Sequence, residues 1–320
     1  MKLLDNNFDD YLNEKKKNKP IHTKLQKIYD RLSNNIKDMN NIIFYGPSGS
    51  GKYTQSLLFI EKFSPSNLKY QKKLTVTYNK LEYFFKISDV HFEIDMSILG
   101  CISKLLWNEI YLHIIDILLA RTNKIGIILC KNFHTTHNEL LEIFYSYMQK
   151  NYTNIELKFI IISEHISFIP NNIIKNCEII NISKPSNAII KKTFNLKNND
   201  NISDINNLKD LIYNIPELKD ISKNFINKLY NLIVNYNTAF KYINFRDIIY
   251  DIFIYDININ DFIWNLNEKL MTDNHIKDKH VNTILTNTYN FYQLYNNNYR
   301  AIYHVENYLL KIISIIHSDE

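Results

Sequence analysis

Glycine is scarce in this chain, which has five glycines in 320 residues, where an average composition would supply roughly 22. Asparagine, isoleucine, lysine and tyrosine are abundant instead, as an AT-biased genome would produce, so composition alone carries little functional information. Three of the five glycines are Gly46, Gly49 and Gly51. Glycines retained together against such a bias indicate a backbone conformation that other residues adopt poorly.

Cysteine is also scarce, and long apolar runs are absent. The three cysteines lie far apart in the sequence, which argues against a disulfide framework and favours a reducing, intracellular environment. The N-terminal residues have no apolar core of signal-peptide length, and no run reaches the roughly 18 apolar residues that a membrane span needs. Secretion and a membrane partner are therefore not expected. The net charge of +5 permits contact with nucleic acid but does not select it.

The apolar fraction of 45% is sufficient for a core, and the length predicts two or three domains. From residue 42 to about 185, short apolar runs alternate with helical ones, the pattern of βαβ units around a parallel sheet covered on both faces. Helices are expected at 102–120 and 137–150, where apolar residues recur every three or four positions. The expected strands are 42–45, 74–78, 125–129, 157–162 and 178–182.

The pattern of apolar and polar residues changes after residue 186. Strand-like runs give way to helical stretches separated by polar clusters, which is typical of a domain boundary. We therefore expect a base domain at 1–186, a small helical domain at 187–250 and a second helical region at 251–320. The Asn-rich stretch 198–207 is expected to be a surface loop. The clearest helix is the last, where one face carries Ile302, Val305, Leu309, Ile312 and Ile316.

The clustered glycines lie between the strand expected at 42–45 and an apolar helix that begins near Lys52. In a phosphate loop, glycines let backbone N–H groups surround phosphate oxygens, and a lysine reaches the outer phosphates. An ordinary strand-to-helix turn is the less favoured interpretation, because strand, spacing and lysine all agree with the motif. The predicted nucleotide-binding residues are Gly46, Pro47, Ser48, Gly49, Ser50, Gly51, Lys52, Tyr53 and Thr54.

The metal-binding parts of such a site are altered in two places. The motif has Ser or Thr directly after the lysine to hold Mg²⁺, whereas this chain has Tyr53, and Thr54 is rotated from that position by about 100°. The strand 125–129 should end in the acidic Walker B residues, but it leads into Cys130 and Lys131. Lys131 would repel Mg²⁺, although it could neutralise a nucleotide phosphate.

These two defects predict a folded phosphate-loop domain that has lost hydrolysis. We expect no catalytic residues, no bound metal, and Mg²⁺ binding that is weak or absent. ATP or ADP, if held, would be structural. A zinc site at Cys130, His134 and His137 is not expected, because a structural site needs four ligands and no fourth is nearby.

Several segments resemble the small subunits of replication factor C, the eukaryotic-type sliding-clamp loader, and most of all its non-hydrolysing small subunit. That subunit has a GPSGxGKxT loop in which the residue after lysine is neither Ser nor Thr, and residues 46–54 read GPSGSGKYT. The other similar segments are 91–100 (HFEIDMSILG), 138–151 (NELLEIFYSYMQKN), 177–186 (CEIINISKPS) and 300–311 (RAIYHVENYLLK).

The resemblance implies an α/β AAA+-type base domain, a helical lid and a helical collar. It implies a catalytically degenerate subunit of a hetero-pentameric clamp loader, which helps place a trimeric sliding clamp on primer-template DNA while other subunits hydrolyse ATP. The location that it implies is intracellular, in the nucleus or at a viral replication site.

Two family features are altered. The Ser-Arg-Cys motif, whose arginine reaches a neighbouring subunit's nucleotide, is replaced by Lys175, Asn176 and Cys177, and lysine lacks the planar bidentate geometry of arginine. The residue that senses the γ-phosphate would fall at Ser163 or Glu164.

Two alternatives stay open. A nucleotide or nucleoside kinase also begins with a phosphate loop, and the base domain offers Arg121 for its chemistry but no acid on the strand 125–129. The other alternative is an AAA+-like scaffold of another replication complex.

Overall fold

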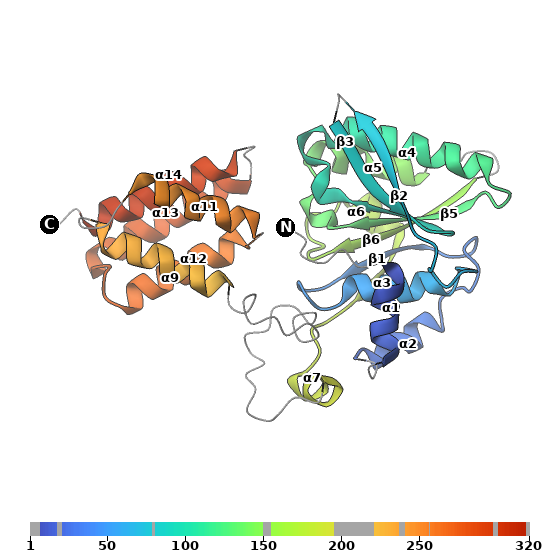
Figure 1. Ribbon diagram of the computed structural model, residues 1–320, viewed down its shortest axis with the longest axis horizontal. Coiled ribbons are helices and arrows are strands. Elements are labelled where there is room, and N and C mark those ends of the chain that lie inside the picture. Colours follow the sequence, from blue (N-terminus) through green and yellow to red (C-terminus); the bar gives the residue numbers. More distant parts are fainter. Residues whose placement is uncertain are drawn as a thin grey trace. The chain divides into compact units, whose positions relative to one another are not determined.

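The computed structural model describes residues 7–17, 21–78, 81–149, 155–194, 221–236, 241–255, 257–296 and 300–317. The described residues form two compact units, an α/β unit within Leu4–Asn214 and a helical unit within Ile215–Glu320 (Figure 1). Each unit has buried clusters of its own. The Asn-rich stretch 198–207 lies outside the described residues.

The α/β unit is built on a seven-stranded sheet in the order β2-β3-β4-β5-β6-β1-β7. Strands β4, β5, β6, β1 and β7 are mutually parallel, whereas β2 and β3 add an antiparallel edge. The carboxyl ends of the parallel strands therefore meet at one edge of the sheet, where ligands bind in open α/β folds. The strands are β1 (Asn41–Tyr45), β2 (Lys72–Tyr78), β3 (Leu81–Ile87), β4 (His91–Asp95), β5 (Ile125–Lys131), β6 (Glu156–Ser163) and β7 (Cys177–Asn181).

Helices cover both faces of this sheet (Figure 1). The period of two along a strand sends alternate side chains to opposite faces, so Ile43 packs with one cluster and Ile42 and Phe44 with the other. The first face is covered by α4 (Ser103–Ala120), α5 (Asn138–Gln149) and α6 (Asn171–Lys175). The second is covered by α1 (Phe8–Lys17), α2 (Thr23–Tyr29) and α3 (Lys52–Glu61).

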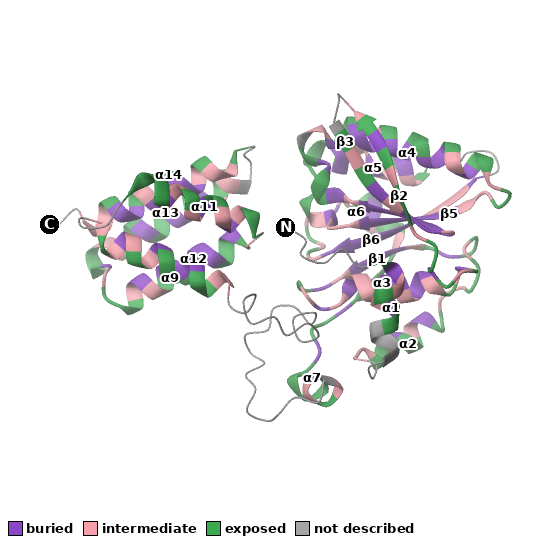
Figure 2. Cartoon of the chain, in the orientation of Figure 1, coloured by how far each residue is buried: buried purple, intermediate pink, exposed green. Residues whose placement is uncertain are grey.

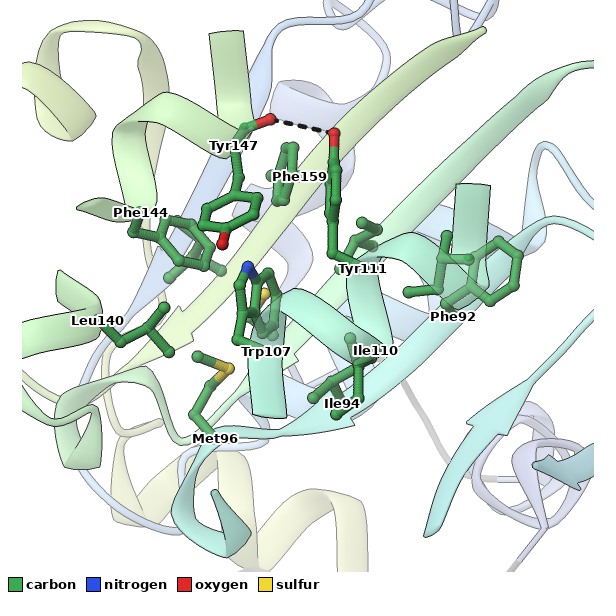
Figure 3. Packing of buried hydrophobic residues seen from close by; sticks show 14 of the residues in the cluster. Phe92, Ile94, Met96, Trp107, Ile110, Tyr111, Leu140, Phe144, Tyr147 and Phe159 are labelled. Atoms are coloured by element: carbon green, nitrogen blue, oxygen red, sulfur yellow. Dashed lines mark hydrogen bonds between the residues drawn. The ribbon is translucent and has the colours of Figure 1, made fainter. Parts of the chain in front are cut away.

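Trp107 on α4 lies at the centre of the first cluster and is fully buried (Figure 3). Its ring centroid is 5.1 Å from that of Phe144 and 6.2 Å from that of Tyr147, both on α5. The hydroxyl of Tyr111 donates to the carbonyl oxygen of Tyr147 at 3.4 Å. These contacts join α4 to α5, and Figure 2 shows the buried residues concentrated between helices and sheet.

The α/β architecture that was predicted is confirmed: a mainly parallel sheet with flanking helices is followed by a helical region. Two strands, β3 and β4, were not predicted, and the strand expected at 74–78 lies in the antiparallel edge rather than in the parallel core. Strand β4 escapes a search for apolar runs because its buried residues include His91 and Glu93, although a covered parallel strand normally reads as apolar throughout.

The second unit consists of helices whose apolar faces meet in one cluster. The predicted boundary at 250 falls within this cluster, since α11 contacts α14 and both α11 and α12 contact α9. The described part of 187–250 is itself divided, because α7 (Asn187–Phe194) belongs to the α/β unit. The helices of the second unit are α9 (Ile221–Val234), α11 (Tyr242–Ile254), α12 (Ile259–Thr272), α13 (Asp278–Asn296) and α14 (Ala301–Ile316). Across the described residues, no helix has both the length and the apolarity of a membrane span.

A buried polar network joins three helices of this unit. Asn267 Nδ2 donates to Tyr308 Oη at 2.7 Å and to Thr288 Oγ1 at 3.2 Å, and the two hydroxyls are 2.8 Å apart. Because all three side chains are buried, Tyr308→Phe should lower the free energy of unfolding by about 1–2 kcal/mol, the range for leaving a buried polar group without its partner. Urea unfolding of the full chain, followed by circular dichroism, measures this.

The matched control is Tyr303→Phe on the same helix, where the ring is 48% exposed. It should change stability by less than about 0.5 kcal/mol, as surface substitutions usually do. Equal effects of the two substitutions would show that the network does not stabilise the helical unit.

Candidate nucleotide-binding site

The predicted phosphate loop connects β1 to α3 at the carboxyl edge of the sheet. Gly46, Gly49 and Gly51 have φ values of 156°, 69° and 89°, in the region that residues with a Cβ rarely adopt. At Gly46 an added Cβ would lie 2.1 Å from the carbonyl oxygen of Ile182, just beyond β7. The glycines are thus required by backbone shape at all three positions, and by close packing at the first. The other predicted loop residues lie with them: Pro47 and Ser48 are exposed, Ser50 is buried, and Tyr53 and Thr54 are half-buried in the first turn of α3.

The loop is also held from the N-terminal side, by a residue that sequence reasoning missed. His22 Nε2 lies 2.9 Å from the carbonyl oxygen of Ser50, a hydrogen bond in which the ring nitrogen donates. The Ser50 hydroxyl is buried and has no hydrogen-bond partner among the described residues. His22 precedes α2 and lies outside the phosphate-loop motif, so only the fold brings it to the loop.

Lys52 is folded back onto the loop. Its Nζ donates to the carbonyl oxygens of Gly46 and Pro47, each at 2.8 Å, and lies 3.8 Å from a carboxylate oxygen of Glu164. Burial lowers the pKa of Lys52, and Glu164 partly offsets that shift. The ammonium is therefore positioned within the loop to meet a phosphate, which would compete with the carbonyl groups and Glu164 for it.

Tyr53, Glu93 and Lys131 form a triad beside the first turn of α3. The Tyr53 hydroxyl donates to Glu93 Oε2 at 2.6 Å, and Lys131 Nζ donates to Glu93 Oε1 at 3.2 Å. The same Nζ lies 4.5 Å from the centroid of the Tyr53 ring, a cation–π distance. Burial lowers the pKa of Lys131, but Glu93 and Asp95 more than offset this, so its pKa is raised above the ordinary lysine value.

Cys130 does not belong to this site, which corrects the sequence prediction. Along β5 the side chains alternate, so Cys130 packs in the cluster under α4 and α5, while Lys131 points to the opposite face and Glu93. Burial raises the pKa of the Cys130 thiol, with a further rise from Cys177. On β5, Ile127 and Leu129 pack in the cluster under α1, α2 and α3, and Lys131 follows them on the same face before the chain leaves the strand at Asn132.

Further polar side chains lie at the carboxyl edge of the sheet. Asn132 Nδ2 donates to Asp95 Oδ1 at 2.9 Å, and His134 Nε2 lies 3.9 Å from Glu164 Oε2. The pKa of His134 is lowered, first by burial. Of the two positions predicted for phosphate sensing, Glu164 contacts Lys52, whereas the Ser163 hydroxyl donates to the carbonyl oxygen of His165.

The loop residues of this site fit a nucleotide phosphate, and the side chains at the two altered positions contact one another. Loop glycines, a helix N-terminus and Lys52 are the groups that bind phosphate. Mg²⁺ needs an octahedron of oxygen ligands, yet Tyr53 donates its hydroxyl to Glu93, and that carboxylate already receives a lysine.

The segment that was predicted to be an altered arginine finger lies at the other edge of the sheet. Lys175 ends α6 and is exposed, and Cys177 pairs with Asn41 at the start of β1, away from the phosphate loop at its end. Asn176 Nδ2 donates to the Tyr145 hydroxyl at 3.1 Å and to the carbonyl oxygen of Asn172. Burial raises the pKa of Cys177 to about 12. This segment does not contribute to the chain's own phosphate loop.

No protein-family model matches the sequence, and no curated protein matches it significantly. Among solved structures, a DNA polymerase III gamma subunit-related protein from Thermotoga maritima is similar, with 10% identity over 93% of this chain and 100% of that one, at a TM-score of 0.45. The RuvB Holliday junction branch migration motor of Thermotoga maritima matches at 14% identity over 56% of this chain and 49% of its own, at 0.31. PCH-2 of C. elegans matches at 11% over 67% and 60%, at 0.33. Likenesses this distant do not assign a function.

Proposed function

We propose that this chain is a nucleotide-holding but non-hydrolysing subunit of a replication factor C-like clamp loader. The observation that carries the proposal is the contrast within one site. The phosphate loop keeps the glycine conformations and the lysine of a working loop, while Lys131, paired with Glu93, stands where a hydrolase would hold its metal.

The loss of hydrolysis follows from what phosphoryl transfer requires. A P-loop ATPase needs a metal between the β- and γ-phosphates and a group that orients the attacking water. Here the strand that should supply both carboxylates ends in Lys131 and is followed by Asn132, and Glu93 is neutralised by Lys131. A nucleotide bound in this loop would raise the stability of the fold, since a ligand that binds only the folded state stabilises that state by mass action.

The proposed partners are those of the resemblance: sister AAA+ subunits in a hetero-pentamer, a trimeric sliding clamp and primer-template DNA. Lys175 and Asn176 are exposed, and neither is the arginine that would reach a neighbouring subunit's nucleotide. We therefore propose that the chain does not activate a neighbour's nucleotide. A nuclear or viral replication site is proposed on the same basis.

The kinase alternative is weakened by the position of Arg121. Its guanidinium donates to the carbonyl oxygens of Asp89 and Ser88 at 2.9 and 3.2 Å and lies over the Phe92 ring. These residues are at the amino ends of β4 and β5, opposite the phosphate loop. Arg121 therefore has a structural role and is not placed to act on a transferring phosphoryl group. A scaffold role in another replication complex differs from the proposal only in its partner.

Copurification and ATP turnover test the proposal together. We expect the chain to copurify with a trimeric clamp and four AAA+ sister subunits, and the isolated chain to show no ATP turnover above background. Turnover by the isolated chain that disappears in Lys52→Ala would contradict the loss of hydrolysis. A stable monomer with phosphotransfer activity would support the kinase, and copurification with a replication complex that lacks a clamp would support the scaffold.

A further inference from the structure

Lys131 places a fixed positive charge beside the first turn of α3, where the loop delivers a phosphate. Its side chain is 19% exposed, and that of its partner Glu93 is 6% exposed, so the lysine is the more accessible member of the pair. An ammonium has three N–H donors, and Lys131 uses one of them on Glu93. The remaining donors are those that a phosphate oxygen would accept from.

The geometry around this ammonium is that of a carboxylate holding a cation. In a magnesium-dependent loop, an acidic residue of the neighbouring strand helps to hold Mg²⁺ next to the phosphates. Here Glu93 supplies the carboxylate from β4, Lys131 supplies a tethered cation from β5, and the Tyr53 ring faces that cation at 4.5 Å. Free Mg²⁺ would meet a like charge and a carboxylate that is already neutralised.

We propose that this site binds a nucleoside di- or triphosphate in its metal-free form, with the Lys131 ammonium in place of Mg²⁺. The inference rests on the nucleotide-holding role proposed above, but not on the identity of the assembly. Lys52 and Lys131 then provide the two positive charges that the phosphates contact, and the loop N–H groups provide the neutral donors.

Calorimetric titration of the full chain with ADP and with ATP tests this, in EDTA and in excess MgCl₂. The dissociation constant in EDTA should equal or lie below that in MgCl₂. Binding that is tighter in MgCl₂ by more than about threefold overturns the inference, as does a lack of binding in both conditions. Because copurification with a clamp and sister subunits is measured separately, either failure is distinguishable from failure of the clamp-loader proposal.

Lys131→Met removes the cation and should weaken binding in EDTA by about tenfold or more, the equivalent of one good charge-assisted contact. Since that variant leaves Glu93 buried and unpaired, Glu93→Gln with Lys131→Met provides a second form without a buried charge, and it should show the same loss. Lys124→Met, just before the amino end of the same strand, is the matched control and should bind as the unmodified chain does. Binding by both Lys131 variants at unmodified affinity overturns the inference.

The reciprocal variant combines Tyr53→Thr with Lys131→Asp, which restores a hydroxyl and an acid at the two altered positions. Its nucleotide affinity should become dependent on Mg²⁺, with tighter binding in MgCl₂ than in EDTA. If this variant stays indifferent to Mg²⁺, Lys131 does not occupy the metal position and the inference is wrong.

Discussion

Gly46→Ala is expected to destabilise the α/β unit by about 4 kcal/mol, the combined order of overpacking and of an unfavourable backbone conformation. The new methyl group would lie 2.1 Å from the carbonyl oxygen of Ile182 and 3.0 Å from its carbonyl carbon. These are backbone atoms that directly follow β7, so they cannot rotate away as a side chain could. Either the loop or the end of β7 has to move, and the phosphate loop loses its shape in both cases.

The measurement is urea unfolding followed by tryptophan fluorescence. Trp107 is fully buried in the α/β unit, whereas Trp264 in the helical unit is 54% exposed, so the larger signal change reports the unit that contains Gly46. Gly100→Ala is the matched control, because Gly100 also has positive φ, at 54°, but nothing lies within 4 Å of an added Cβ. It should cost about 1 kcal/mol from backbone strain alone. Equal costs at the two positions would show that the contact with Ile182 does not matter.

Acidification from about pH 6.5 to pH 4 should lower the stability of the α/β unit by about 3 kcal/mol through His91 alone. This ring is fully buried on β4, its Nδ1 lies 2.6 Å from Ser88 Oγ and its centroid 4.8 Å from that of Phe8. Burial lowers the pKa of His91 to about 4, with Glu93 and Asp89 opposing the shift. Its Nε2 has no hydrogen-bond partner among the described residues, so a proton there would be poorly stabilised.

The sign follows from which state binds the proton. Between the two pKa values the unfolded chain holds a proton on His91 and the folded chain does not, so stability is present above about pH 6.5 and is lost as pH falls toward 4. Unfolding curves of the unmodified chain and of His91→Leu across this range measure the contribution as a difference in slope. The exposed His137→Asn should keep the slope of the unmodified chain. Parallel curves for His91→Leu and the unmodified chain would contradict the prediction.

The parts of the fold that the sequence predicted are those set by local pattern. The strand at 42–45, the helix that begins at Lys52 and the helices near 102–120 and 137–150 all appear in the structure within one residue of their expected bounds. Strands β3 and β4 were not predicted from the sequence, because polar residues interrupt their apolar runs. Their positions depend on pairing with β2 and β5, which is a property of the folded sheet.

The candidate site likewise has a part that the sequence predicted and a part that only the fold shows. The loop residues and the unusual Tyr53 were evident from the motif. The partner of Tyr53 was not, because Glu93 lies 40 residues further along the chain and reaches it only across the sheet. The assignment of Cys130 failed by one residue, and in a strand a shift of one residue moves a side chain to the other face.

The sequence by itself predicted a phosphate loop and the replacement of its two usual metal-ligand positions. This was possible because the loop is contiguous, and its shape depends on glycines and a lysine at fixed spacing. Only the tertiary structure decided which side chains meet at those two positions. Side-chain alternation along β5 and the pairing of β4 with β5 bring Lys131, Glu93 and Tyr53 together, and such contacts between distant segments are set by packing rather than by local pattern.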